Sequence, residues 1–436
     1  MRRWFSLVAI LVPAAFAIAG LNSDMLSLDD EAIQYATRPV DDPVTVLQQR
    51  IDKGETALKY DGELGYLPSV LQALNVSSTS QVLVFSKTSF QAPLIGPHTP
   101  RALYFRDNVA VGFVRTGEVL EFAAVDPKQA IRFYTLDQEP VAHPRFERRD
   151  TCLQCHQSSA TLGIPGLMVR SVFPDRNGMP ITSAGGFITD HRSPLKDRWG
   201  GWYVTGTTGT QVHMGNAVMP DATGAGQPSF EGVSNVTNLD RFIDTSAYLT
   251  PHSDIVALMT LEHQTQMENL IIRAGWEARI AMAQNAAFNK AFGEPETQIR
   301  ESTAHRIDAA VEELLDYMFF GEETKLASPI KGTSGFTEYF EKLGPRDSKG
   351  RSLRDFDLKT RMFRYPCSFL IYSEAFDGMP QIVKDRLYRR MWEVLSSRDH
   401  SPQFAHLSPS DRKAILEILL DTKKDLPAYW REGAKS

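Results

Sequence analysis

The chain has 436 residues, of which 42% are hydrophobic and 23% charged, and its formal net charge at pH 7 is −6. This composition excludes a disordered chain and predicts a substantial buried core. The negative charge argues against nucleic acid as a partner. Only three cysteines occur, so a disulfide framework does not hold the fold together.

The N-terminus has the pattern of an export signal. Arg2 and Arg3 precede an uncharged run over residues 4–19, and Ala17-Ile18-Ala19 is a small-x-small cleavage site. We predict a signal peptide over residues 1–19 and a periplasmic mature protein with a formal charge of −8. The alternative is an uncleaved N-terminal anchor, but Pro13 interrupts the run, which is shorter than the ~20 residues that span a membrane. No later segment is apolar enough to be a transmembrane segment.

The predicted fold class is α+β, with an antiparallel β-rich N-terminal part. Residues 44–58 are compatible with a helix, and from Gln81 onward short runs rich in Val, Phe and Tyr predict strands. Alternation in VAVGFV and VLEFAAV, separated by Arg115-Thr116-Gly117-Glu118, predicts a hairpin. We assign residues 20–144 to this N-terminal region.

The rest of the chain divides into a Gly/Pro-rich centre, residues 145–250, and a mainly α-helical part, residues 251–436. The centre has few long apolar periods, so we expect loops and short strands wrapped around a cofactor. Helical periodicity predicts helices over 254–292, 297–320, 379–397 and 409–423, and Ser408-Pro409-Ser410-Asp411 is a helix start. Residues 351–364 mix basic and acidic side chains and predict a solvated helix face.

The chemistry-bearing motif is C-x-x-C-H, within TCLQCHQS at 151–158. Two thiols separated by two residues can each reach one vinyl group of a porphyrin, and the following histidine then lies under the iron. The motif predicts one covalent haem c held by Cys152 and Cys155, with His156 as the proximal iron ligand. A redox disulfide would be expected in a thioredoxin-like βαβ unit, which is not evident. A zinc site would need a fourth ligand, and there is no second cysteine pair.

These residues, together with the export signal, resemble those of c-type cytochromes. The remaining chain does not resemble a small cytochrome c, because 132 mature residues precede Cys152 and 280 follow His156. The phrases YFRDNVAVGFV, FYTLDQ and GWYVTGTTGT are similar to those of large, little-characterised exported mono-haem proteins. That resemblance implies haem binding and no particular reaction.

The sixth iron ligand decides between electron transfer and chemistry at the iron. His213 and Met214 are the preferred candidates, because the glycine after them lets the chain approach a flat ring. His263 is the other contender, since it shares a helical face with apolar residues. Met168, Met179 and His191 are also near in sequence. Six arginines could contact the haem propionates: Arg145, Arg148, Arg149, Arg170, Arg192 and Arg198.

We therefore expect a periplasmic mono-haem cytochrome that transfers electrons to or from a redox partner protein or a small-molecule electron donor or acceptor. The first alternative is a haem enzyme of the peroxidase or oxygenase type, because an electron carrier does not need 417 residues. The second is a haem-based sensor or binding module. The sequence assigns no catalytic residue, although His263 could act as a distal acid or base if the sixth iron position is open.

Overall fold

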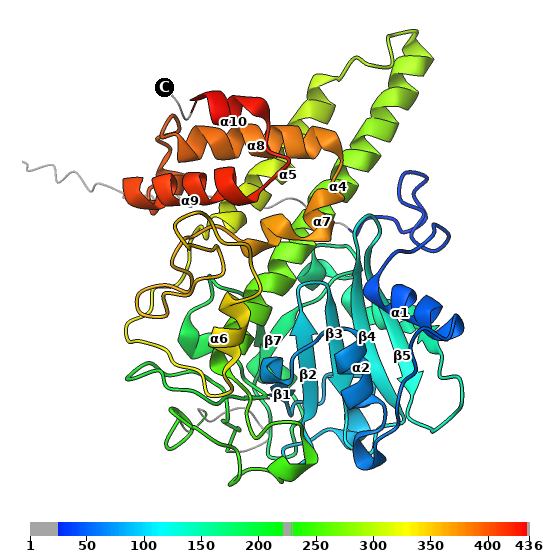
Figure 1. Cartoon of the computed structure of the whole chain (residues 1–436), viewed down its shortest axis with the longest axis vertical. Helices are drawn as coiled ribbons and strands as arrows, with labels where there is room; N and C mark the ends of the chain where they lie inside the picture. The colour runs from blue at the N-terminus through cyan, green and yellow to red at the C-terminus, as the bar shows by residue number, and fades with distance from the viewer. Residues whose placement is uncertain (1–24, 221–227, 229, 434–436) are drawn as a thin grey trace, which may run out of the picture.

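The computed structural model describes residues 25–220, 228 and 230–433. The predicted signal peptide and the alternative anchor lie outside the described residues. In the described part, a seven-stranded antiparallel sheet has the order β6-β5-β4-β3-β2-β1-β9 (Figure 1). Its strands are β1 (Val82–Val84), β2 (Arg101–Arg106), β3 (Val109–Phe113), β4 (Val119–Asp126), β5 (Ala130–Asp137), β6 (Phe146–Arg148) and β9 (Trp202–Tyr203). A separate two-stranded sheet pairs β7 (Val169–Val172) with β8 (Gly186–Thr189).

The predicted hairpin is confirmed. Strands β3 and β4 pair antiparallel, with Val109 opposite Ala124 and Gly112 opposite Glu121. The turn between them includes Thr116 in the left-handed region, at φ 60°. Because side chains alternate along a strand, this register places one set of residues on each face of the sheet.

Two short helices cover the outer face of the sheet. Helices α1 (Pro43–Asp52) and α2 (Leu67–Ala73) contribute Leu47 and Val70 to a buried cluster with strand residues such as Val111. The helix predicted over 44–58 is shorter, because the chain turns at Gly54, where φ is +70°. A positive φ favours glycine and ends a helix.

The long helix α4 (Ile255–Phe292) lies on the inner face. Asp254 caps its first turn by accepting from the Val256 and Ala257 backbone N–H groups at 2.8 and 3.2 Å. Gly293, at φ +69°, ends the helix. The predicted helix over 254–292 is thus confirmed, and Figure 1 shows the end of α4 extending beyond the sheet beside α5 (Glu301–Met318).

The C-terminal part is helical, so the α+β prediction is confirmed. Besides α4 and α5 it contains α6 (Phe336–Glu341), α7 (Glu374–Asp377), α8 (Gln381–Leu395), α9 (Pro409–Thr422) and α10 (Ala428–Gly433). The predicted start of α9 is a capping box of Ser408 and Asp411. Among the helices that the structure describes, none is long and apolar enough to cross a membrane.

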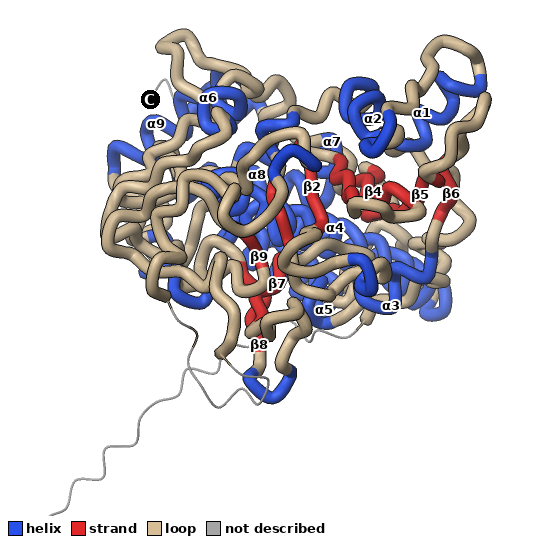
Figure 2. Tube along the Cα trace, turned by 90° about the horizontal axis from the view of Figure 1, so that it is seen from below, coloured by secondary structure: helices blue, strands red, loops and turns tan. Residues whose placement is uncertain are grey.

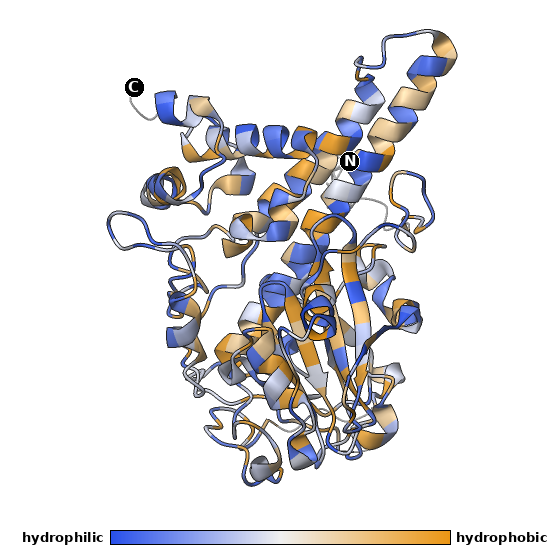
Figure 3. Ribbon diagram, turned by 45° about the vertical axis from the view of Figure 1, so that its right-hand side comes forward, coloured by the Kyte–Doolittle hydropathy of each residue, from blue (hydrophilic) through white to orange (hydrophobic). Residues whose placement is uncertain are grey.

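In its described residues, the central segment consists of turns, short helical turns and strands of two to four residues, and Figure 2 shows how much of the chain is loop. It nevertheless buries apolar side chains, including Ile164, Val169 and Trp199, in the cluster around α4. That cluster draws on residues from Ile33 to Trp430, and many strand residues beside it are hydrophobic (Figure 3). The domain boundaries at 144/145 and 250/251 stay predictions.

Residues 351–364 do not form the predicted helix but a series of turns. Arg354 is 4% exposed, pairs with Asp107 and lies over the Phe340 ring at 4.6 Å. The prediction of a solvated helix face was wrong, because the arginine has partners on other elements that the charge pattern does not show.

Candidate functional site

Cys152 and Cys155 lie three residues apart on one helical turn after β6. A 3₁₀ turn, Asp150–Cys152, leads into the short helix α3, Leu153–His156. Residues three apart lie on the same side of a helix. Both thiols are free; Cys152 is half-buried and Cys155 is exposed. The turn can therefore present both sulfur atoms to a single ligand.

The His156 ring is held in one orientation. Its Nδ1 atom lies 2.9 Å from the carbonyl oxygen of Gly166, and its ring centroid is 4.8 Å from that of Phe133. Because a carbonyl oxygen only accepts, Nδ1 carries the proton and Nε2 keeps a lone pair. Burial lowers the pKa of His156, which favours this neutral form. A neutral imidazole whose second nitrogen donates to a carbonyl is the usual state of a metal-bound histidine.

The loop that holds His156 is anchored to α4. The Gly166 backbone N–H donates to the His156 carbonyl at 2.8 Å, so two hydrogen bonds join these residues. Asn269 binds the neighbouring backbone, accepting from Leu167 N at 3.2 Å and donating to Leu167 O at 2.7 Å. A Cβ atom at position 166 would clash with the Asn269 side chain. Glycine is therefore required there for the loop to approach the helix.

An ion pair of Arg101 and Glu121 lies beside the motif. Glu121 also accepts from Ser89 Oγ at 2.9 Å and from Gln91 Nε2 at 2.7 Å. Burial raises the pKa of the Cys152 thiol; Glu121 raises it further and Arg101 opposes it. Sequence reasoning missed this pair. The available signal was Glu121 on the inward-facing side of an otherwise apolar strand.

The two preferred sixth-ligand candidates are buried in the central segment. His213 is 1% exposed and its ring lies 5.4 Å from that of Trp199, edge to face. The Met214 sulfur accepts a hydrogen bond from Ser171 Oγ at 3.7 Å. Within the described ranges, no hydrogen bond or ring contact joins His156 to either residue. Ligation of iron by His213 or Met214 stays a prediction.

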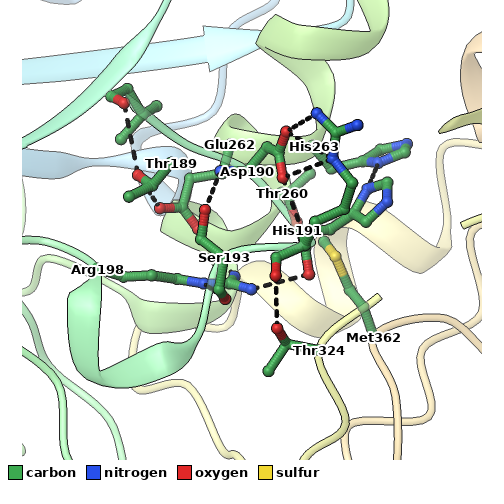
Figure 4. A network of polar contacts seen from close by, with 12 residues as sticks. Thr189, Asp190, His191, Ser193, Arg198, Thr260, Glu262, His263, Thr324 and Met362 are labelled. Atoms are coloured by element: carbon green, nitrogen blue, oxygen red, sulfur yellow. Dashed lines mark hydrogen bonds and ion pairs between the residues drawn. The ribbon is translucent and has the colours of Figure 1, made fainter. Parts of the chain in front are cut away.

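His263 has partners for both ring nitrogens. Nδ1 lies 2.9 Å from Nδ1 of His191 (Figure 4), and Nε2 lies 2.8 Å from Ser368 Oγ. The ring also stacks on Phe320 at 4.4 Å. His263 thus has protein partners for both nitrogens, although it lies on an otherwise apolar face of α4. A role for His263 as an iron ligand would require breaking one of these hydrogen bonds.

A buried ion pair adjoins this histidine pair. Arg198 Nη1 lies 3.0 Å from Glu262 Oε2, and Thr189 Oγ1 donates to Glu262 Oε1 at 2.6 Å (Figure 4). Arg198 also donates to the carbonyls of His191 and Ser193 at 2.9 and 2.8 Å. Burial raises the pKa of Glu262 to about 7, although Arg198 opposes that rise. Sequence reasoning missed Glu262; its signal was a carboxylate within the apolar part of α4.

The other predicted arginines are occupied or exposed. Arg198 pairs with Glu262, Arg192 with Asp190, Arg149 with Glu147, Arg148 with Asp150 and Arg145 with Asp52. Met179 is exposed and Met168 is partly buried. Arg170 is exposed, and Arg148 keeps one buried donor, Nη2, that has no hydrogen-bond partner among the described residues.

We expect the protein to lose stability in mild acid because of His213. Burial lowers the pKa of His213 to about 4, whereas an unfolded chain takes up this proton near pH 6.5. Stability from the neutral ring is therefore present above pH 6.5 and falls as the pH drops toward 4, by about 3 kcal/mol. Urea unfolding of the His213→Asn variant should show a smaller loss between pH 7 and pH 4. The exposed His305→Asn is the control, and an unchanged loss in His213→Asn would contradict the assignment.

Comparisons with known proteins give no match, either among protein-family models or among curated proteins and solved structures. Among the described residues, no three His, Cys, Asp or Glu side chains gather into a group that could hold a bare metal ion. The functional interpretation therefore rests on the geometry of the turn Cys152–His156.

Proposed function

We propose that the protein is an exported mono-haem c-type cytochrome that transfers single electrons. The observation that carries the proposal is the turn Cys152–His156, on which two free thiols accompany a histidine whose Nδ1 proton is fixed by Gly166. This donor set fits haem c, because it offers two thioether sites and one imidazole nitrogen for iron. The proposed partner is a redox protein or a small-molecule electron donor or acceptor.

The residues of the turn have separate tasks in this proposal. Each thiol of Cys152 and Cys155 adds across one vinyl group: a carbon–sulfur bond forms, the vinyl double bond becomes single, and the thiol proton ends on carbon. His156 offers Nε2 to the iron, and Gly166 holds the ring. When bound, haem supplies a reversible one-electron change at iron. Export to the periplasm is supported by the N-terminal sequence pattern.

A haem enzyme is the second candidate, and one observation favours it. Both ring nitrogens of His263 are hydrogen-bonded to protein groups, so this candidate sixth ligand is not free in the described structure. An iron without a protein ligand on its sixth position admits peroxide or other small ligands. The same chain would then be a haem-dependent oxidoreductase.

The test uses the full-length protein matured in a periplasm with haem-attachment machinery. We expect covalent haem, six-coordinate absorption and magnetic circular dichroism spectra in both redox states, and a reversible reduction potential. Five-coordinate ferric iron that reacts rapidly with peroxide would reject the electron carrier in favour of the enzyme. A mature wild-type chain without covalent haem would reject both. The His156→Ala variant should lose the native spectrum, and the exposed His305→Ala should keep it.

A further inference from the structure

Three apolar residues on the inner face of the sheet remain partly exposed. They are Leu103 on β2, Ala110 on β3 and Ala123 on β4, and we name them the open strip. Ala110 pairs with Ala123 in the strand register, and Leu103 lies opposite Gly112 next to them. The other apolar residues of this face are buried: Phe105, Val125, Ile131 and Phe133.

The open strip lies beside the haem motif. Ala123 pairs in register with Phe133, and the Phe133 ring contacts the His156 ring. Cys152 and Leu153 are likewise partly exposed and pack against the same cluster of apolar residues. Small and apolar side chains thus lie next to both the histidine and a free thiol, as a flat apolar ligand attached at the motif would require.

Two charged residues continue the same face of the sheet. Glu121 lies in one row with Gly112 and Leu103, and Arg101 lies two residues before Leu103, in the next row of that face. The Arg101 guanidinium crosses Gly112, where a Cβ atom would lie 2.8 Å from Nη2. Its Nε is buried and has no hydrogen-bond partner among the described residues. The Nε–H group of Arg101 is therefore available to donate a further hydrogen bond.

Glu121 does not depend on Arg101 alone. Ser89 and Gln91 both donate to its Oε1 atom, so the carboxylate keeps partners if Arg101 turns toward another anion. Arginine is well suited to bind a second carboxylate, because its planar donors match carboxylate geometry. Arg101 was not among the arginines that the sequence suggested.

We infer that the open strip is the surface that binds the porphyrin attached at Cys152 and Cys155, and that Arg101 binds one propionate of that porphyrin. The inference rests on the proposed function and assigns the residues that receive the haem. The competing position is an open pocket of about 370 Å³ on the other part of the motif loop, lined by Ser159, Ala160, Leu162, Asp190 and Arg192 among others. If the porphyrin lies on the open strip, a larger side chain there should reduce haem content, whereas a larger side chain in the pocket should not.

The first experiment fills each position with a leucine side chain. Ala123→Leu fills the open strip, and Ala160→Leu fills the pocket. Haem content is measured by intact mass of the full chain matured in the periplasm. We expect Ala123→Leu to lose most of its haem and Ala160→Leu to match the wild type; the reverse result, or full haem content in both, would overturn the inference. Ala73→Leu, at a half-buried position under the outer face, controls for misfolding caused by added volume.

The second experiment does not depend on how Ala123→Leu folds. Arg101→Gln removes a cation beside the motif, and Lys349→Gln removes one from the exposed ion pair with Glu417 on α9, in another part of the fold. We expect a lower reduction potential for Arg101→Gln only, because loss of a nearby positive charge favours the oxidised iron. Equal potentials in both variants would refute the role of Arg101. A wild-type chain without haem would instead remove the proposed function, and this inference with it.

Discussion

Replacing both Cys152 and Cys155 with alanine is expected to abolish covalent haem attachment. The two thiols lie on one turn and are the only described sulfur atoms near His156 that are free to form thioether bonds. Without them, haem can be held only by His156 and by packing, and denaturation releases it. The expected result is a mature chain without the haem mass under denaturing conditions, whereas each single variant keeps at most one thioether bond.

The third cysteine provides the matched control. Cys367 is fully buried in the apolar cluster, and burial raises the pKa of its thiol far above the usual range. A neutral, enclosed thiol is not reactive. The Cys367→Ala variant should therefore keep wild-type haem content. Haem that stays bound to the double variant in denaturant, or that is lost from Cys367→Ala, would show that the motif is not the attachment site.

Breaking the Arg198–Glu262 pair is expected to be the most destabilising of the simple substitutions. Both side chains are almost completely buried, at 4% and 0% exposure. Arg198→Met leaves Glu262 without its cation and leaves two carbonyl groups without a donor. Removing one partner of a buried ion pair costs about 3–5 kcal/mol. The measurement is the free energy of urea unfolding of the mature chain.

Two further variants make this prediction specific. The double variant Arg198→Met with Glu262→Leu replaces both charges by apolar groups, and it should be more stable than the sum of the single losses predicts. Lys196→Met removes a cation from the exposed pair with Asp197 and should cost less than about 1 kcal/mol. Additive losses at Arg198 and Glu262, or a loss at Lys196 equal to that at Arg198, would contradict the assignment.

The local elements of the fold could be predicted from the sequence because their causes are local. The turn at Arg115–Glu118, the caps at Asp254 and Ser408, and the helical periodicity of residues 254–292 all act over a few neighbouring residues. The helix over 44–58 was predicted too long for a related reason. The pattern continued past Gly54, and only the backbone conformation at that glycine shows where the helix stops.

The sequence by itself determined the C-x-x-C-H motif, on which the haem proposal rests, because its spacing suits two thiols and a histidine on one helical turn. Only the tertiary structure decided what faces that turn. The carbonyl of Gly166 binds His156 across a loop of ten residues, and Arg101 meets Glu121 through the strand register. His191 meets His263 across 72 residues of chain. Such contacts depend on which elements pack together, and that choice is made by burial of the whole core rather than by any local pattern.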